Sequence, residues 1–302
     1  MKRDNIIIGS RRSKLALIYA EKVKSKLSKF YSGKIEIKKI TTTGDQNQSE
    51  RLSSMGGKGL FSTNIENELL ENKIDIAVHA LKDMPSFDTK GLLTNCYLKR
   101  NSPNEILISK NIKFKDLNNG SVIGTSSFRR EFQLKNIRAD LVYKLIRGNV
   151  DTRIKKLENN EYDAIILSKA GIESLNLQSK ITDEFEVTKL VPCAGQGIIA
   201  IQCNENNQDI LRLIEKINDT QTRIIANTER EVLRILEGDC DTAVGVFASI
   251  KKDKIELTAE LFSVDGKKRF FMSENENIEN HIVLAKRIAE DLKKQSKGSY
   301  KG

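Results

Sequence analysis

The 302-residue sequence has no tryptophan, and aromatic residues make up only 6% of it. Proteins that bind single-stranded nucleic acid stack bases on aromatic side chains, so this scarcity argues against that class without excluding it. No run of about 18 apolar residues occurs, which excludes a transmembrane helix. The first apolar stretch, Ile6–Ile8, is too short for a signal peptide, so we expect a cytoplasmic protein with no membrane partner.

Cysteine and histidine are also few: the chain has four cysteines and two histidines, and no Cys-x-x-Cys spacing. Neither a zinc site nor a disulfide framework is therefore expected, and we predict no metal. The apolar runs around Cys96, Cys193 and Cys203 predict buried thiols. Cys240 differs, because it follows a predicted helix and falls on a loop.

Positive charge is in excess and is unevenly distributed. The net charge is +10; residues 218–302 carry 15 Lys/Arg and 15 Asp/Glu, whereas residues 1–217 carry 36 and 26. The whole excess therefore lies in the first two thirds of the chain. Such an excess suggests an anionic partner, which the charge alone leaves open among nucleic acid, a membrane surface and a small polycarboxylate.

Alternating strand and helix patterns predict an α/β fold with two lobes around a cleft, followed by an α+β unit. Turn-rich segments at 99–104 and 191–197 mark the two crossings between lobes. We predict a first lobe of residues 1–98 with 194–217, a second of 99–193 and a C-terminal unit of 218–302. In the last unit a helix from about Thr220 is expected to end at a Gly238 cap, and the tail from about residue 295 is expected to be disordered.

Asp83 closes a predicted buried strand that begins near Ile76. Pro85 removes a ladder donor and biases Met84 away from helix, so the strand is expected to end there. In open α/β sheets, ligands bind beyond the carboxyl ends of strands. Asp83 is therefore a candidate catalytic residue, although an isolated carboxylate of this kind is more often an ordinary ion-pair partner.

Like Asp83, many cations stand at predicted strand ends or helix starts. A glycine-rich loop adds Lys58, and Ser13 and the run Thr125–Ser127 stand where helices are expected to begin. Arginine forks and free helix N–H groups bind carboxylates, so this arrangement predicts a cleft for a ligand with many carboxylates. The cations at strand ends and helix starts are Arg11, Arg12, Lys82, Arg129, Arg130, Arg147 and Arg153.

Five short sequence motifs, in the same order along the chain, resemble those of the hydroxymethylbilane synthase family, also called porphobilinogen deaminases. They span nearly the whole chain: Gly56–Phe61, Val78–Pro85, Gly124–Arg130, Arg147–Arg153 and Leu236–Cys240. The resemblance implies two lobes of the type II periplasmic-binding-protein topology and a third domain. It also implies a monomer that condenses four porphobilinogen molecules, with loss of ammonia, on a dipyrromethane cofactor held by a thioether to Cys240.

The same resemblance assigns roles to residues. Asp83 is implied as the catalytic carboxylate. Cofactor binding is implied for Cys240, Lys82, Ser13, Thr125, Ser126, Ser127, Arg129, Arg130, Arg153 and Gly171. Substrate binding is implied for Arg11, Arg147, Asn149, Gln196, Lys58 and Phe61.

The sequence departs from the family pattern in three ways. Ser54 stands where many members have lysine, and Ala80 where serine is common. Asp239 and Asp241 flank Cys240, and nearby carboxylates lower the thiolate fraction, so cofactor loading is expected to be slower. A non-catalytic two-lobed carboxylate-binding protein and a basic nucleic-acid-binding protein remain the alternative interpretations.

Overall fold

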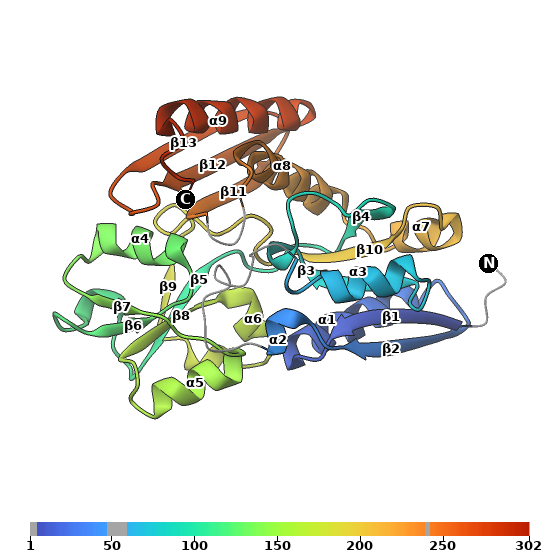
Figure 1. The fold of residues 1–302 in the computed structure, drawn as a ribbon, viewed down its shortest axis with the longest axis horizontal. Helices are drawn as coiled ribbons and strands as arrows, with labels where there is room; N and C mark the ends of the chain where they lie inside the picture. The colour runs from blue at the N-terminus through green and yellow to red at the C-terminus, as the bar shows by residue number, and fades with distance from the viewer. Residues whose placement is uncertain (1–4, 47–58, 239–241, 302) are drawn as a thin grey trace.

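The computed structural model describes residues 5–46, 59–238 and 242–301, which form three units that each contain one sheet (Figure 1). Two units are α/β lobes and the third is a small α+β unit beside both of them. The predicted fold class is therefore confirmed. Within the described ranges, no helix has both the length and the apolarity needed to cross a membrane.

The first lobe is built on a five-stranded sheet in the order β2-β1-β3-β10-β4. β1 pairs in parallel with β2 and β3, whereas β10 runs antiparallel to β3 and β4. The strands are β1 (Asn5–Arg11), β2 (Lys34–Ile40), β3 (Ile76–Ala80), β4 (Leu92–Tyr97) and β10 (Ile199–Asn204). The helices are α1 (Lys14–Leu27), α2 (Thr43–Gln46), α3 (Thr63–Leu70) and α7 (Gln208–Glu215).

The second lobe has a matching sheet in the order β7-β6-β8-β5-β9. β6 is parallel to β7 and β8, and β5 is antiparallel to β8 and β9. The strands are β5 (Glu105–Ser109), β6 (Val122–Gly124), β7 (Val142–Lys144), β8 (Ala164–Ser168) and β9 (Asp183–Phe185). The helices are α4 (Phe128–Ile137), α5 (Val150–Glu158) and α6 (Lys169–Ser174).

Continuous apolar runs form the central strands of this second sheet because both of its faces are covered. Leu107 and Ile166 pack in the core on one face. Ile106 and Ile165 pack in the core on the other.

The chain crosses between the lobes twice. It leaves the first sheet after β4, enters the second with β5, and returns to the first with β10. Both crossing strands, β5 and β10, occupy the fourth place in their sheets and run antiparallel to the third. Each lobe therefore has four strands that run in one direction, whose carboxyl ends share one edge of the sheet, and one crossing strand that runs against them.

The third unit has a three-stranded antiparallel sheet, covered by two helices that share its core. Its strands are β11 (Val244–Lys251), β12 (Lys254–Phe262) and β13 (Arg269–Asn277), and its helices are α8 (Thr220–Leu236) and α9 (His281–Ser296). The predicted cap of α8 was wrong by one residue. Glu237, not Gly238, adopts the left-handed conformation, with φ of 53°.

The predicted disorder from about residue 295 is also wrong. Helix α9 continues to Ser296, and Tyr300 beyond it is only 4% exposed. The Tyr300 hydroxyl donates a 3.1 Å hydrogen bond to the Leu236 carbonyl at the end of α8. Lysine-rich composition suggested a solvated tail, but one aromatic ring buried in the core of the third unit orders it.

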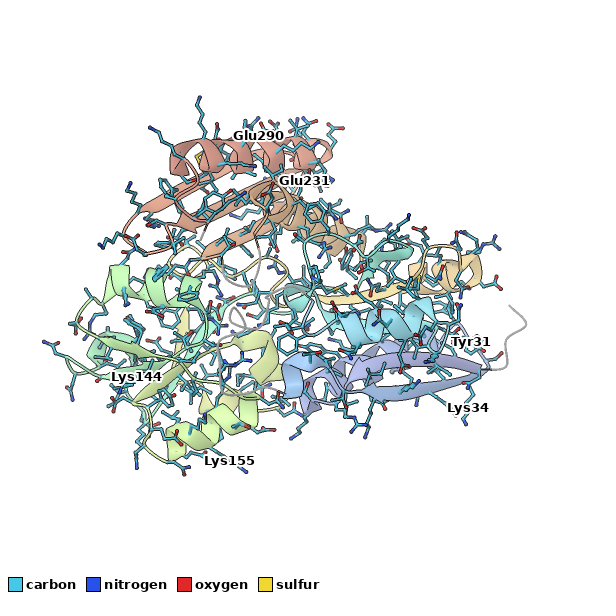
Figure 2. All side chains as sticks on the ribbon, in the orientation of Figure 1. Tyr31, Lys34, Lys144, Lys155, Glu231 and Glu290 are labelled. Carbon is cyan, nitrogen blue, oxygen red and sulfur yellow. The ribbon has the colours of Figure 1, made fainter. Side chains whose placement is uncertain are left out.

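Charged side chains cover the outside of all three units (Figure 2). Lys34 projects from the first lobe and Lys144 and Lys155 from the second, all of them exposed. The labelled acids Glu231 and Glu290 belong to the third unit (Figure 2).

We predict that Tyr300→Ala lowers the free energy of unfolding by about 3 kcal/mol, because it removes a buried ring from the core. Tyr300→Phe should lower it by only about 1 kcal/mol, through loss of the hydroxyl bond. Urea unfolding followed by circular dichroism measures both changes. Lys301→Ala is the control, since its ion pair with Glu237 is exposed. A Tyr300→Ala variant as stable as wild type would contradict the docking of this segment.

Candidate active site

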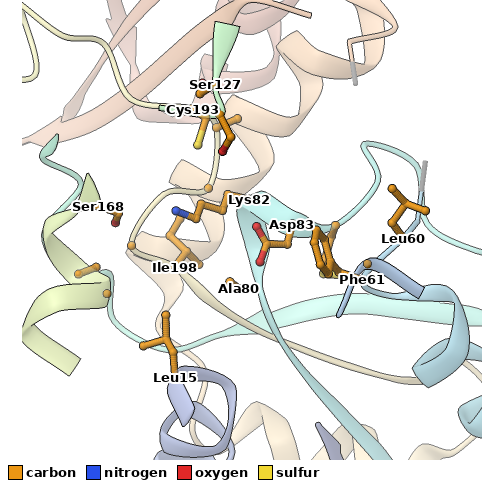
Figure 3. A pocket seen from close by; sticks show the side chains of 18 of the residues that line it. Leu15, Leu60, Phe61, Ala80, Lys82, Asp83, Ser127, Ser168, Cys193 and Ile198 are labelled. Carbon is orange, nitrogen blue, oxygen red and sulfur yellow. The ribbon is translucent and has the colours of Figure 1, made fainter. Parts of the chain in front are cut away.

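A cavity of about 620 Å³ lies where the two lobes and the third unit meet. The first lobe contributes Arg11 and Asp83, the second Arg130 and Arg153, and the third Gly238. The cavity thus lies at the carboxyl ends of the parallel strands of both lobes, where α/β sheets bind their ligands. Figure 3 shows Asp83 between Lys82 and Phe61, with Ser127 and Cys193 approaching from the opposite wall.

Asp83 lies in a 3₁₀ turn, Leu81–Asp83, directly after β3. Because β1 runs parallel to β3, Arg11 at the end of β1 reaches the same edge, and its Nη1 lies 3.4 Å from Asp83 Oδ2. The Arg11 guanidinium also lies 4.0 Å from the centre of the Phe61 ring. A Cβ at Gly44 would lie 2.3 Å from that ring, so glycine is required there. These contacts give a carboxylate, a cation and an aromatic ring side by side.

Cations of the second lobe are crowded around the same cavity. Burial, followed by the charges of Arg130 and Arg147, lowers the pKa of Arg153 to about 10. Burial likewise lowers the pKa of Arg147. Arg153 also donates from Nε to the Gly148 carbonyl at 2.8 Å. Bound carboxylates are favoured at such a place, because they would compensate for the lost water and for the repulsion between the cations.

Glu105 is the residue that sequence reasoning missed. It is fully buried, and its two oxygens accept from Arg129 Nη2 at 2.6 Å and from Arg130 Nη2 at 2.7 Å. Burial raises the pKa of Glu105, but the charges of Arg130 and Arg129 together outweigh it and hold that pKa at about 2. Its position was the one indication that could have been used: this acidic residue stands at the start of the apolar run Ile106–Ile108, directly after a turn-rich segment.

The two arginines bound to Glu105 are not equivalent. Arg129 Nη1 also donates to Gln133 Oε1 at 3.2 Å and to the Val191 carbonyl at 2.8 Å, so its donors are directed at protein groups. Arg130 Nη1 donates to the Ile166 carbonyl at 3.2 Å. Its Nε is buried and has no hydrogen-bond partner in the part of the chain that the structure describes. Arg130 therefore differs from Arg129 in having one buried donor that none of the described groups accepts.

The predicted hydroxyl groups cap helices, as their positions indicated. Ser13 accepts from the Ala16 N–H at 3.3 Å, and Ser127 accepts from the Arg130 N–H at 3.4 Å. Thr125 accepts from the Ser127 N–H at 3.2 Å. The helix start at α4 is thus partly satisfied by its own side chains. Ser13, Ser126 and Ser127 line the cavity, whereas Thr125 is buried away from it.

The structure brings most of the remaining candidates to the cavity. Phe61, Lys82, Asn149 and Gly171 line it. Gln196 does not line it; this side chain is fully buried and donates to the Pro103 carbonyl at 2.7 Å. Lys58 and Cys240 lie outside the described residues, as do Ser54, Asp239 and Asp241.

Two further residues at the cavity were not anticipated. Cys193 was expected to be buried, but it is half-buried and lines the cavity. Tyr19 of α1 also lines it; burial, opposed by a hydrogen bond with Ser174 and reinforced by Asp83, raises the pKa of Tyr19 to about 12. His79 belongs to the core instead, where burial lowers its pKa to about 4 and keeps it neutral.

The fold and the site define a two-lobed α/β protein that binds an anionic ligand, with one carboxylate set among many cations. Residues 6–212 match the family model "Porphobilinogen deaminase, dipyromethane cofactor binding domain", and residues 224–294 match "Porphobilinogen deaminase, C-terminal domain". The chain therefore belongs to the porphobilinogen deaminase family.

Curated relatives agree with this assignment. The chain is 44% identical over 265 residues to a porphobilinogen deaminase of Bacillus cereus, covering 86% of each. It is 42% identical over 269 residues to one of Geobacillus kaustophilus, covering 88% of this chain and 87% of that one. Among solved structures, an arginine-specific periplasmic binding protein of Salmonella typhimurium is 12% identical, with a TM-score of 0.42, over 71% of this chain and 92% of that one.

We predict that Glu105→Gln removes an acid-sensitive part of the stability. The pKa of Glu105 is lower in the folded chain than its ordinary value of 4.5. Its pairing therefore stabilises the fold fully above about pH 4.5, and this stabilisation is lost as the pH falls toward 2. Over that window the change is about 3 kcal/mol.

Urea unfolding of wild type and variant at several pH values between 2 and 7 measures this difference. Glu105→Gln should be about 3 kcal/mol less stable at pH 7, since it leaves buried arginines unpaired, and should lose less stability on acidification. Glu158→Gln is the control, because its ion pair with Lys180 is exposed. Parallel pH profiles for Glu105→Gln and wild type would contradict the assignment.

Proposed function

We propose that this chain is a hydroxymethylbilane synthase, which joins four porphobilinogen molecules head to tail with loss of ammonia. The observation that carries the proposal is the position of Asp83, beside Arg11 and within a cavity that the two lobes line with cations. Membership of the porphobilinogen deaminase family supports the same reaction. The enzyme class is a transferase, EC 2.5.1.61, acting in the biosynthesis of haem and other tetrapyrroles.

The cavity suits the carboxylates of the substrate. Each porphobilinogen carries an acetate and a propionate, so a chain of linked pyrroles is a polyanion that needs many cations. Arg11 and Arg147, together with Asn149, Phe61, Gln196 and Lys58, are proposed to bind incoming substrate. Lys82, Arg129, Arg130 and Arg153 are proposed to bind the cofactor, assisted by Ser13, Thr125, Ser126, Ser127 and Gly171. The cavity lining supports this assignment, since Arg129, Arg130 and Arg153 all contribute to it.

The chemistry requires one well-placed carboxylate. Loss of ammonia leaves a cationic azafulvenium, which the free α-carbon of the preceding pyrrole attacks. Asp83 is proposed to stabilise this cation through the pyrrole N–H groups and to accept the proton that the attacking α-carbon loses once the new bond has formed. At about 4 Å and an effective dielectric constant near 20, such a contact contributes on the order of 4 kcal/mol, or about three decades of rate.

The cofactor is dipyrromethane, proposed to be attached to Cys240. When bound, it supplies the free pyrrole α-carbon to which the first substrate is joined. Glu237 and Gly238, directly before the segment that contains Cys240, line the cavity. A thioether has no good leaving group, so the anchor remains when the product is released. We further propose that the protein acts as a cytoplasmic monomer, without a metal, a nucleic acid or a membrane.

We predict that Asp83→Asn folds, retains the cofactor and loses at least about 100-fold in kcat, because the amide cannot stabilise a cation or accept the proton. Turnover is measured from hydroxymethylbilane formed from porphobilinogen, and cofactor content from the intact mass. Asp116→Asn, at an exposed position in the second lobe, is the matched control. Retention of more than about a tenth of wild-type kcat by Asp83→Asn would exclude this role.

We predict that wild type exceeds the 34.1 kDa mass of its chain by two linked pyrrole units. Cys240→Ala should have the unmodified mass and a lower melting temperature, since a ligand that binds only the folded state stabilises it. Cys193→Ala is the sharpest control, because Cys193 also lines the cavity and should not affect the adduct. An adduct on Cys193, or full activity without Cys240, would overturn the assignment.

A further inference from the structure

The segment that follows Asp83 is held by the third unit. Met84, Pro85, Ser86 and Phe87 line the cavity directly after the catalytic turn. Arg230 of α8 donates from Nη1 to the Pro85 carbonyl at 2.9 Å and from Nη2 to the Ser86 carbonyl at 3.2 Å. Arg230 Nη2 also lies 3.3 Å from Asp88 Oδ1.

A second arginine on the same helix reinforces this attachment. Arg234 Nε donates to the Ser86 carbonyl at 3.0 Å, so that oxygen accepts from two guanidinium groups one turn apart. Arg230 is only 3% exposed. Its burial lowers its pKa, an effect that Asp88 opposes. A guanidinium is buried in this way only where acceptors compensate for the lost water.

Helix α8 is itself fixed against the rest of the molecule, through Glu229. This fully buried carboxylate accepts from Arg100 Nη1 at 2.7 Å, from the Gly195 N–H at 2.7 Å and from the Ala248 N–H at 2.8 Å. Its partners come from both crossing segments and from β11. The backbone of α8 at Arg230, the next residue, is therefore held in place, and so is the segment that Arg230 binds.

The far end of α8 reaches the same cavity. Leu233, Glu237 and Gly238 line it, and Gly238 is the last described residue before the segment with Cys240. From Arg230 to Leu236, where α8 ends two residues before Gly238, the helix rises about 9 Å. One rigid element thus connects the segment that carries Asp83 with the point where the cofactor is proposed to be attached.

We propose that Arg230, assisted by Arg234, is a positioning residue that sets the place of Asp83 relative to the end of α8. This inference rests on the proposed function, because it concerns the distance from the catalytic carboxylate to the anchored pyrrole chain. Arg230 touches neither reactant; it acts through the backbone of Pro85 and Ser86. Displacement of a catalytic group by about 1 Å can lower the rate about 100-fold.

The pattern of changes in kcat, KM and melting temperature distinguishes a positioning role of Arg230 from a role in substrate binding or in stability. The substrate carboxylates are assigned to other cations, so Arg230→Met should leave KM within about threefold while kcat falls at least tenfold. The dipyrromethane adduct should remain complete by intact mass, because Cys240 and its cations are unchanged. Arg230→Lys keeps the charge and can donate to one of the two carbonyl oxygens of Pro85 and Ser86, so it should recover part of the lost kcat.

Arg138 provides a matched control. It donates to the carbonyls of Phe114, Lys115 and Leu117 and pairs with Asp140 at 2.6 Å, so its bonds resemble those of Arg230 but lie in the second lobe away from the cavity. Arg138→Met should lower the melting temperature and leave kcat at the wild-type value. Arg234→Met, which removes one hydrogen bond to the Ser86 carbonyl and an ion pair with Glu231, should fold and lower kcat about threefold.

The experiment compares kcat, KM, melting temperature and intact mass for the loaded full-length chain of wild type and the four variants. If wild type is active and the kcat of folded Arg230→Met lies within twofold of the wild-type kcat, the positioning role alone is overturned. The same holds if Arg230→Met lowers kcat no more than Arg138→Met does. If Arg230→Met does not fold, Arg234→Met decides: lower kcat at an unchanged KM supports the role, and wild-type kcat overturns it. An inactive wild type overturns the proposed function instead, and the positioning role with it.

Discussion

Two arginines at the wall of the cavity share one buried carboxylate, and the charge of the site depends on this sharing. Glu105 accepts from both Arg129 and Arg130, so two cations are held in place while only one charge is neutralised. Without that carboxylate, buried guanidinium groups would repel one another; with one more acid, the cavity would lose its affinity for carboxylates. The arrangement leaves a preorganised positive wall opposite Asp83.

The same principle, one buried ionic group that fixes several elements, recurs at the junction of the three units. Glu229 binds Arg100 and two backbone N–H groups, and Arg230 beside it binds the carbonyls after Asp83. The cavity therefore has walls from three units that are tied together near α8. A condensation reaction benefits from such rigidity, because the reacting carbon atoms and the carboxylate must be aligned within a fraction of an ångström.

Local signals in the sequence predicted a large part of this structure. The strand before Asp83 and the helix starts at Ser13 and Ser127 were predicted from residues that act on their near neighbours. The same reasoning failed at Glu237, where the left-handed cap preceded the glycine, and at Tyr300, where one ring outweighed a polar composition. Both failures depend on packing between α8, α9 and the end of the chain.

The sequence by itself determined the family, because five motifs in order place catalytic, cationic and anchoring residues at fixed distances along the chain. It also determined that Asp83 and Arg11 would meet, since parallel strands share one edge. Only the tertiary structure decided which cations face the ligand and which are bound by protein. Arg129 and Arg130 meet a carboxylate 24 and 25 residues away, and Arg100 meets one 129 residues away. The apolar periodicity of the sequence does not indicate such pairs, because burial of an ion depends on groups that only the folded chain brings within hydrogen-bond distance.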